Sequence, residues 1–347
     1  MQDIRTQHSI HSGTVTSVYL KHFHRRFLLL VLPLGAILLV AVVAVVMGPY
    51  DVPIKSIFRA LTGNADAATV VVITNIRMPR MIAAIVCGWG LSLSGLSLQS
   101  LLKNPLGSPS TLGISQGAAF GASAAIVVFG TRTFSVTLFA FGGAMTATII
   151  VLILSGLKRL SSEAVILAGV ALSSLFVSAT ILIQYLATET QLAMVVFWTF
   201  GDVARSNWKE IGILTGMVFL ATAHLTSIRW DLNALASGEE AAKGLGVNVK
   251  RIRMTGMIMA ALVAAIATAF HGVIAFIGLL APHMARRLVG DDHRLLILFS
   301  SVLGALLLLT ADNVGRIIIG SGVLPVGVIT SFLGAPMFLY LLIRGYR

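Results

Sequence analysis

The sequence predicts an all-α polytopic membrane protein of about ten transmembrane helices, and three observations support this fold class. Hydrophobic residues make up 57% of the chain and charged residues only 11%, whereas an average soluble domain has about 25% charged residues. Apolar stretches of roughly 17 to 24 residues recur, which matches the ~20 residues that a helix needs to cross a bilayer. The charges gather in the connectors between these stretches, where a membrane helix would end.

The predicted spans follow one another from the N-terminal to the C-terminal end of the chain. They cover Phe27–Met47, Met81–Leu101, Leu112–Phe129, Val136–Gly156, Ala164–Ala187, Lys209–Ile228, Met254–Phe270, Val273–Val289, Leu295–Ala311 and Leu324–Ile343. His271-Gly272 divides the seventh span from the eighth, because together they are far too long for one crossing. The two prolines of Lys103–Pro109 forbid continuous helix between the second and third spans.

The distribution of lysine and arginine predicts that both termini lie in the cytoplasm. With this orientation, about two thirds of the 25 lysines and arginines fall in inside segments, as the positive-inside rule expects. We therefore divide the chain into a cytoplasmic tail, 1–26, and one transmembrane domain, 27–347. The net charge of +12 is then mostly a topology signal, and without a basic face on a soluble fold we expect no nucleic-acid partner.

The beginning of the chain predicts a retained first span. The apolar run after Arg26 is longer than the core of a signal peptide, and no small-residue cleavage site follows it. The tail histidines, His8, His11, His22 and His24, have no cysteine or carboxylate at ligand spacing, so we expect no metal site. The single Cys87 excludes an internal disulfide framework.

The acidic residues and the missing motifs bear on the energy source. All thirteen acidic residues are predicted to fall in connectors or at span ends, so no carboxylate is expected near the middle of the membrane to hold a coupling ion. The chain has no phosphate-binding G-x-x-x-x-G-K-[ST] loop, and its largest inside connector, 229–253, is too short for an ATPase domain. If ATP powers this protein, the ATPase is therefore expected to be another polypeptide, while an ion-coupled secondary transporter is an alternative of a different class.

One motif resembles a catalytic nucleophile. Gly113–Gly117 matches G-x-S-x-G, which in hydrolases presents its serine on a turn above a sheet. Here the motif lies among small apolar residues, which allow membrane helices to approach closely. We interpret it as helix packing; a membrane enzyme that uses Ser115 is the alternative. No catalytic residue, cofactor or metal site is predicted in this chain.

The connector 229–253 predicts a short capped helix. Ser237–Glu240 matches a capping box, in which the serine caps the first turn and Glu240 reaches back. Gly244 is predicted to stop this helix as a left-handed C′ residue. Gly246 would permit a second turn, and Asn248 is a candidate cap for the next span. Such a segment would suit a docking surface, although an ordinary interfacial helix is equally compatible with the pattern.

Short motifs occur in a fixed order from Arg77 to Pro336. They are Arg77-Met78-Pro79-Arg80; Ser94-Gly95, Gln99 and Asn104-Pro105-Leu106; Leu112-Gly113 and Gly117-Ala118; Leu167-Ala168-Gly169-Val170; Trp198, Gly201 and Trp208; Gly238-Glu239, Ala241 and Leu245-Gly246; Phe276–Leu279, Pro282-His283 and Arg286; Asp292-His293-Arg294; Ala311-Asp312 and Arg316; Leu324–Gly327 and Gly334-Ala335-Pro336. With this ordered set the chain resembles the permease subunits of type II ABC importers for ferric siderophores, haem and cobalamin. Gly107 and Ser108 depart from the usual pattern. Gly95 and Gly272 each precede a proline by ten positions, in spans of opposite direction, which is compatible with inverted repeats.

The resemblance implies partners and an activity. It implies two permease subunits, identical or homologous, a cytoplasmic ATPase dimer that binds ATP and Mg²⁺, and an extracytoplasmic substrate-binding protein, all at the cytoplasmic membrane of a prokaryote. The expected cargo is a ferric siderophore or a similar iron complex, with haem or cobalamin as the alternative.

The same resemblance implies roles for individual residues. Binding-protein docking is expected at Arg77, Arg80 and Arg316. ATPase coupling is expected at Ser237, Gly238, Glu239, Glu240, Ala241, Gly244, Leu245 and Gly246. Pathway or structural roles are expected for Gly95, Gln99, Asn104, Pro105, Gly113, Gly117, Pro282 and His283.

Overall fold

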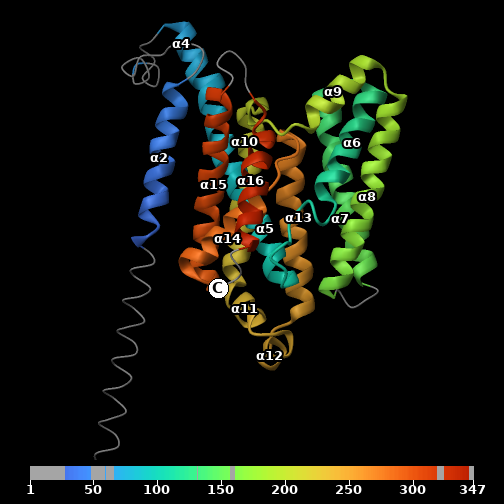
Figure 1. Ribbon diagram of the computed structural model, residues 1–347, viewed down its shortest axis with the longest axis vertical. Coiled ribbons are helices and arrows are strands. Elements are labelled where there is room, and N and C mark those ends of the chain that lie inside the picture. The colour runs from blue at the N-terminus through green and yellow to red at the C-terminus, as the bar shows by residue number, and fades with distance from the viewer. Residues whose placement is uncertain are drawn as a thin grey trace, which may run out of the picture.

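Long helices that run in roughly the same direction make up the described part of the chain (Figure 1). A computed structural model describes residues 28–47, 59, 66–130, 132–156, 161–318 and 324–343. A helix coincides with each of the ten predicted spans. They are α2 (Val31–Val46), α5 (Met78–Leu102), α6 (Ile114–Phe129), α7 (Thr133–Gly156), α8 (Ser162–Leu186), α10 (Trp208–Ser227), α13 (Val249–His271), α14 (Ile277–Val289), α15 (His293–Ile318) and α16 (Val326–Ile343). Six helical segments of the described ranges are long and apolar enough to cross a membrane, and the predicted polytopic helical fold is confirmed.

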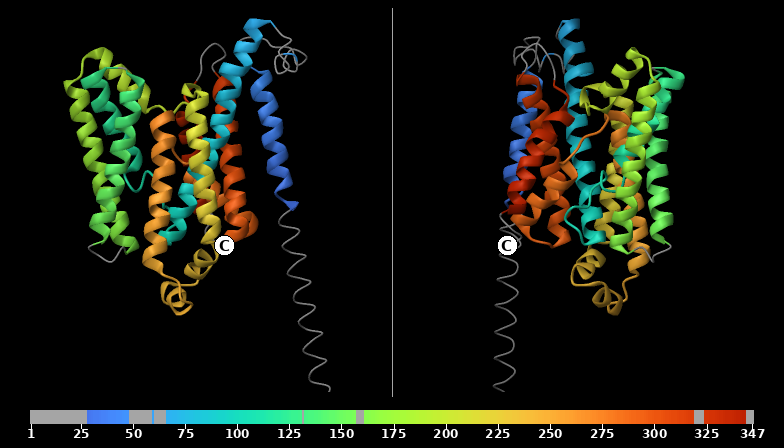
Figure 2. Two further views of the ribbon diagram at one scale, coloured as in Figure 1. Left: turned by 180° about the vertical axis from the view of Figure 1, so that it is seen from behind. Right: turned by 45° about the vertical axis from the view of Figure 1, so that its right-hand side comes forward.

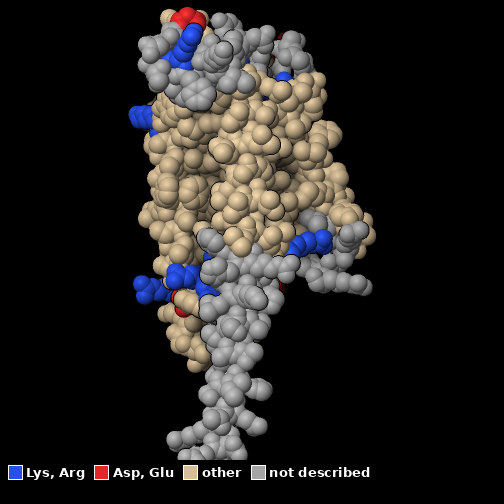
Figure 3. Space-filling model, turned by 90° about the vertical axis from the view of Figure 1, so that its left-hand side faces the viewer, with Lys and Arg blue, Asp and Glu red and all other residues tan. Residues whose placement is uncertain are grey.

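The two ends of the helices carry the charges. On the face drawn in Figure 3, lysine and arginine side chains lie above and below a broad band of uncharged residues. We name the two ends by helices that lie there in Figure 1: the α4 end and the α12 end. The predicted tail, 1–26, lies outside the described residues, and the cytoplasmic placement of the termini stays a prediction.

The second span begins much earlier than the sequence predicts. α4 (Ala67–Val71), the π-helical turn η1 (Val72–Arg77) and α5 form one continuous helical segment of 36 residues. Asp66 caps its start, accepting a hydrogen bond from the Thr69 backbone N–H at 2.9 Å. A start at Met81 is therefore wrong, because polar residues before it continue the helix. As a result, Arg77 and Arg80 lie within a helix and not in a connector.

Helix α5 is the centre of the molecule. Most of its residues are buried, and α10, α13, α14 and α15 pack against it. A second group, α6, α7, α8 and the unpredicted α9 (Glu189–Thr199), stands beside this core and contacts it mainly through α13 (Figure 2).

Small residues allow two helices of the second group, α6 and α7, to pack closely. A Cβ at Gly117 would lie 2.4 Å from the carbonyl oxygen of Gly143, so α6 and α7 approach each other at a distance that only glycine permits. Ser115 is buried in α6, and its hydroxyl lies 3.3 Å from the Ser110 hydroxyl. This geometry agrees with the packing interpretation of the G-x-S-x-G motif.

The eighth span is only partly helical. Gly272, at φ 74°, ends α13, and α14 begins only at Ile277. The intervening stretch is extended at Val273, which forms an isolated β-bridge with Phe200. The 13 helical residues of α14 extend only ~20 Å, less than the ~30 Å thickness of a hydrocarbon core. The predicted continuous helix is wrong here, because irregular backbone can persist at membrane depth where it is buried in protein.

The loop between α10 and α13 also differs in detail from its prediction. It contains α11 (Arg229–Ala236) and α12 (Glu239–Gly244). Ser237 follows α11 in helical conformation, and Gly238, at φ 132°, is the N-cap of α12 without a side-chain cap. The predicted capping box is therefore wrong. Gly244 is still helical, and Gly246, at φ 84°, takes the left-handed turn that Gly244 was expected to make.

The predicted cap on the last helix of this loop is confirmed. The Asn248 side chain accepts a hydrogen bond from the Arg251 backbone N–H at 3.0 Å, which makes Asn248 the N-cap of α13.

Candidate functional site

The loop with α11 and α12, which carries the predicted ATPase-coupling residues, projects from the core at the α12 end (Figure 2). A buried arginine, Arg253, connects α12 to the core. Glu239 accepts a hydrogen bond from Nη2 of Arg253 at 3.2 Å, and Nε of Arg253 donates to the Leu101 carbonyl oxygen at 3.3 Å. Arg253 is 4% exposed. α12 is thus connected to α13 and to the last turn of α5.

The two glutamates of α12 have different surroundings. Burial raises the pKa of Glu239, but Arg253 and Lys243 lower it more, so the net shift is downward. The Glu240 side chain is 90% exposed, and among the described residues it pairs only with Lys243, at 3.0 Å. The hydrogen bonds that Lys243 donates to Glu240 and then to Glu239 raise the pKa of Lys243. Glu239 is therefore the glutamate that joins α12 to the core.

A second connection runs from α11 to the turn between α14 and α15. Asn233 donates through Nδ2 to Oδ1 of Asp292 at 3.1 Å and accepts from the His293 backbone N–H at 2.9 Å. Arg294 lies over the Trp230 ring, 4.9 Å from its centroid, and also pairs with Asp292 at 2.6 Å. Burial raises the pKa of Asp292, but Arg294 and Asn233 lower it to about 2. The sequence motif included Asp292–Arg294, but nothing local indicated Asn233, whose partners lie far along the chain.

Four of the predicted pathway residues, Gln99, Asn104, Pro105 and His283, line one cleft beside the crossing of α5 and α14. Gln99 donates through Nε2 to the Gly278 carbonyl oxygen at 3.0 Å and accepts from Arg286 through Oε1. This cleft of about 390 Å³ opens at the α12 end. It is lined by Gln99, Ser100, Lys103, Asn104, Pro105, Leu232, Ala236, His283, Arg286, Arg287, Asp291 and His293. Gly113 and Gly117 are not part of it, since they pack against α8 and α7 in the second helix group.

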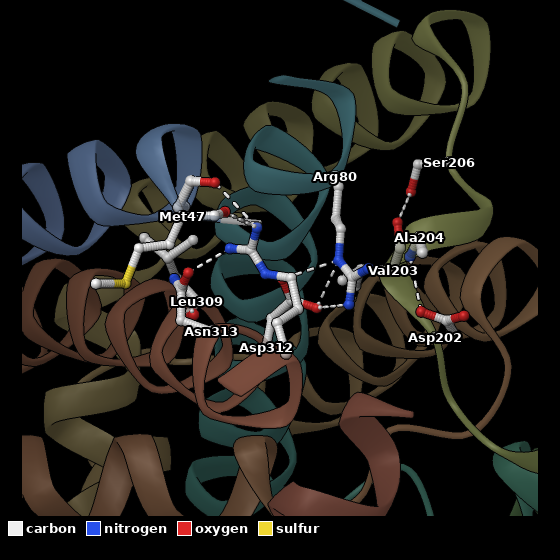
Figure 4. A network of polar contacts seen from close by, with 11 residues as sticks. Met47, Arg80, Asp202, Val203, Ala204, Ser206, Leu309, Asp312 and Asn313 are labelled. Carbon is white, nitrogen blue, oxygen red and sulfur yellow. Dashed lines mark hydrogen bonds and ion pairs between the residues drawn. The ribbon is translucent and has the colours of Figure 1, made fainter. Parts of the chain in front are cut away.

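The three predicted docking arginines gather near the α4 end. Arg80 donates from Nε to both oxygens of Asp312 at 3.0 Å and from Nη2 to Oδ1 at 2.7 Å (Figure 4). Nε of Arg316 lies 3.5 Å from Oδ2 of the same carboxylate. Arg77 donates from Nη1 to the carbonyl oxygens of Val45 and Val46 at 2.6 and 2.9 Å. The cluster therefore connects α2, the α4–α5 segment and α15.

This cluster corrects one expectation about the acidic residues. Asp312 lies inside α15, which extends to Ile318, and is 1% exposed. It was predicted at a span end because the apolar run stops at Ala311. Arg77 and Arg80 are only 5% and 8% exposed. Their role in docking stays a prediction, and it would require their guanidinium groups to leave these internal partners.

Comparisons with known proteins agree with this arrangement. Residues 21–344 match the model of the FecCD transport family. The chain is 46% identical to a putative ABC transporter permease of Methanocaldococcus jannaschii, covering 90% of this chain and 95% of that one. It is 34% identical to the molybdate import permease of Haemophilus influenzae, covering 89% and 94%. Other relatives are named as permeases for Fe(3+)-citrate, hemin and vitamin B12.

A solved structure has the same fold. It is titled an inward-facing conformation of a putative metal-chelate type ABC transporter, and it matches with a TM-score of 0.82 and 31% identity over 91% of this chain and 99% of that one. The resemblance seen in the sequence is confirmed: the chain belongs to the FecCD transport family and is a permease of an ABC importer.

Proposed function

We propose that this permease moves a ferric siderophore or a similar iron complex from an extracytoplasmic binding protein to the cytoplasm, using ATP hydrolysed by a separate ATPase dimer. The observation that supports the energy coupling is the α11–α12 loop, which has two polar connections to the helices. Glu239 and Arg253 connect it to α5 and α13, and Asn233 connects it to the α14–α15 turn. A partner that moves this loop would move both sets of helices, as alternating access requires.

The remaining partners and the location belong to the same proposal. A second permease subunit, identical or homologous, would complete the pathway. The α12 end would face the cytoplasm and the ATPases, which bind ATP and Mg²⁺, in the cytoplasmic membrane of a prokaryote. The charge distribution of the sequence supports this orientation.

The substrate class is proposed from the relatives. A solved relative is described as a putative metal-chelate type ABC transporter, and one of the similar permeases is named for Fe(3+)-citrate. Haem and cobalamin remain the alternative, since relatives named for hemin and vitamin B12 match comparably well.

An ion-coupled secondary transporter has one observation in its favour, the carboxylate of Asp312 inside α15. Both of its oxygens, however, accept hydrogen bonds from Arg80. A coupling-ion site needs carboxylate oxygens that are available to the ion. This pairing therefore favours ATP-driven transport.

Reconstitution in vesicles would test the proposal. The permease, its ATPase and its binding protein should take up labelled ferric siderophore when ATP is supplied, with haemin, cobalamin and molybdate as comparison substrates. Substituting the phosphate-binding lysine of the ATPase should stop uptake even with an imposed ion gradient. Gradient-driven uptake that persists would reject the ABC mechanism, and preferential uptake of another cargo would reassign the substrate.

We also propose that the binding protein docks at the α4 end, with Arg77, Arg80 and Arg316 as candidate contacts. Exposed ion pairs contribute only ~0–1 kcal/mol each, so a combined Arg77→Glu/Arg316→Glu variant is the informative one. It should weaken docking at low salt more than Lys209→Glu, which reverses an exposed cation at the same end. Equal docking by both variants, with the fold intact, would reject the assignment.

A further inference from the structure

The cleft between α5, α11, α14 and α15 is lined by more cationic than anionic side chains, and not all of these cations form ion pairs within the described part of the protein. Lys103, Arg286 and Arg287 face it against one carboxylate, that of Asp291. Nε of Arg286 pairs with Asp291 at 3.3 Å. Lys103 and Arg287 are exposed, and neither side chain forms a hydrogen bond or an ion pair with another described residue. Two cations therefore remain available to an anionic ligand.

The backbone of Lys103, which carries its side chain at the cleft, has an unfavourable conformation. Lys103 follows α5 in the left-handed conformation, at φ 48°, and its N–H and that of Asn104 both reach back to the Gln99 carbonyl oxygen. This is the C′ position of a helix, where glycine is the usual residue because a Cβ is disfavoured there. A lysine in this conformation is a local strain, and such strain is common at ligand-binding positions.

The donors around the cleft fit a phosphate group. An arginine such as Arg287 can grip two oxygens of one phosphate, and a lysine such as Lys103 adds a point charge. Ser100 and His293 line the same wall, hydrogen-bonded to each other at 2.8 Å. The chemical class of ligand is therefore a phosphate ester, either a lipid headgroup or a soluble phosphate.

The level of the cleft favours a lipid. α5 ends at Leu102, α14 ends at Val289 and α15 begins at His293, so the cleft lies where three helices of the core terminate, at the expected boundary of the apolar band. Leu106 and Leu288, each next in sequence to a residue of the cleft, are 45% and 48% exposed. An acyl chain has apolar surface to contact there, whereas a soluble phosphate gains nothing from it.

We propose that this cleft binds the phosphate headgroup of an anionic phospholipid. Basic pockets between transmembrane helices are typical sites for such headgroups. The bound headgroup would bridge the ends of α5 and α14 beside the coupling loop, because Leu232 and Ala236 of α11 form part of the same wall.

A charge-removal pair tests the proposal. Lys103→Gly/Arg287→Gln removes both available cations, and glycine suits the left-handed backbone, so the variant should not lose thermal stability. Lys250→Gln/Arg251→Gln is the matched control, since it removes two exposed cations at the same end but outside the cleft. The full chain in detergent would be titrated with short-chain phosphatidylglycerol, short-chain phosphatidylcholine and inorganic phosphate.

The expected result is a Kd for phosphatidylglycerol that rises about tenfold to thirtyfold in the cleft variant, as expected for the loss of two surface cations, and changes little in the control. Equal weakening in both variants, or in neither, would overturn the proposal. Phosphatidylcholine that binds as tightly as phosphatidylglycerol would also overturn it. Inorganic phosphate that binds as tightly as phosphatidylglycerol would assign the cleft to a soluble anion instead.

Discussion

Arg80 on α5 and Asp312 on α15 form a buried ion pair, although they lie 232 positions apart in the chain. The arginine uses two nitrogens, at 2.7 and 3.0 Å from the carboxylate. The side chains are only 9% and 1% exposed, so each charge depends on the other for its stabilisation. Arg316, one turn after Asp312, is a further cation beside the same carboxylate. This pair fixes α5 against α15 near the α4 end.

We expect Asp312→Asn to destabilise the protein more than Arg80→Gln. Removing one partner of a buried pair costs ~3–5 kcal/mol, and loss of Asp312 also leaves Arg80 and Arg316 facing each other. Thermal unfolding of the purified permease in detergent measures both changes. Glu240→Gln is the control, because its pair with Lys243 is exposed and contributes at most ~1 kcal/mol. Similar losses of thermal stability in all three variants would show that the buried pair stabilises the protein no more than the exposed pair does.

The α11–α12 loop, which we propose as the coupling route, contains a matched pair of glutamates. Glu239→Gln removes the partner of the buried Arg253, so α12 should lose its connection to α5 and α13. Glu240→Gln removes the same charge one residue later but leaves that connection intact. In vesicles with the ATPase and the binding protein, Glu239→Gln should reduce uptake severalfold per ATP hydrolysed, while Glu240→Gln stays near wild type. The proposed coupling route is wrong if both variants transport equally well.

Sequence reasoning was most successful where one local property decides the structure. The length of each apolar run located a helix at all ten spans, and the turn at Lys103–Pro109 followed from two prolines. The predictions failed where a residue's structure depends on a partner far away in the sequence. Arg80 looked like a connector residue because its counter-charge, Asp312, belongs to another span. Val273 looked helical because its apolar side chain does not reveal that its backbone pairs with Phe200.

At the candidate site, too, local features were predicted better than contacts between distant segments. The sequence predicted a short helix between α10 and α13, and α12 lies there. Its cap and its glycine stop were each misplaced, because α11 continues to Ala236 and takes Ser237 into its C-terminal turn. The cleft residues Gln99 and His283 were named separately, and only the crossing of α5 and α14 brings them together.

The two loop glycines should respond differently to alanine. Gly246, at φ 84°, is in a conformation that disfavours a Cβ, so Gly246→Ala should cost ~1 kcal/mol or more of folding stability. Gly244 is helical with open space around it, so Gly244→Ala should be neutral or stabilising by up to ~1 kcal/mol. Thermal unfolding compares the two. The reverse order would support the original expectation that Gly244 makes the turn.

The pairing of Asp292 predicts a pH dependence. Its pKa in the folded protein is about 2, below the ordinary value of 3.8, mainly because hydrogen bonds from Arg294 outweigh the effect of burial. A depressed carboxyl pKa adds stability above the unfolded-state value, and this stability is lost as the pH falls from about 4 towards 2. Over that interval the wild type should therefore lose more thermal stability than Asp292→Asn, which no longer titrates there. Parallel stability curves for the two proteins would contradict the assignment.

The crossing of α5 and α14 depends on a glycine with no room for a side chain. A Cβ at Gly95 would lie 1.8 Å from the Gly278 carbonyl oxygen, the same oxygen that accepts the Gln99 hydrogen bond. Gly95→Ala should therefore force the helices apart, cost about 1–3 kcal/mol as overpacking does, and lengthen that hydrogen bond. Gly142→Ala is the control, because nothing lies within 4 Å of its Cβ position, and the free energy of unfolding should stay the same or rise by up to ~1 kcal/mol. If Gly95→Ala unfolds at the same temperature as the control and transports normally, the close crossing is not required for the fold or for the transport cycle.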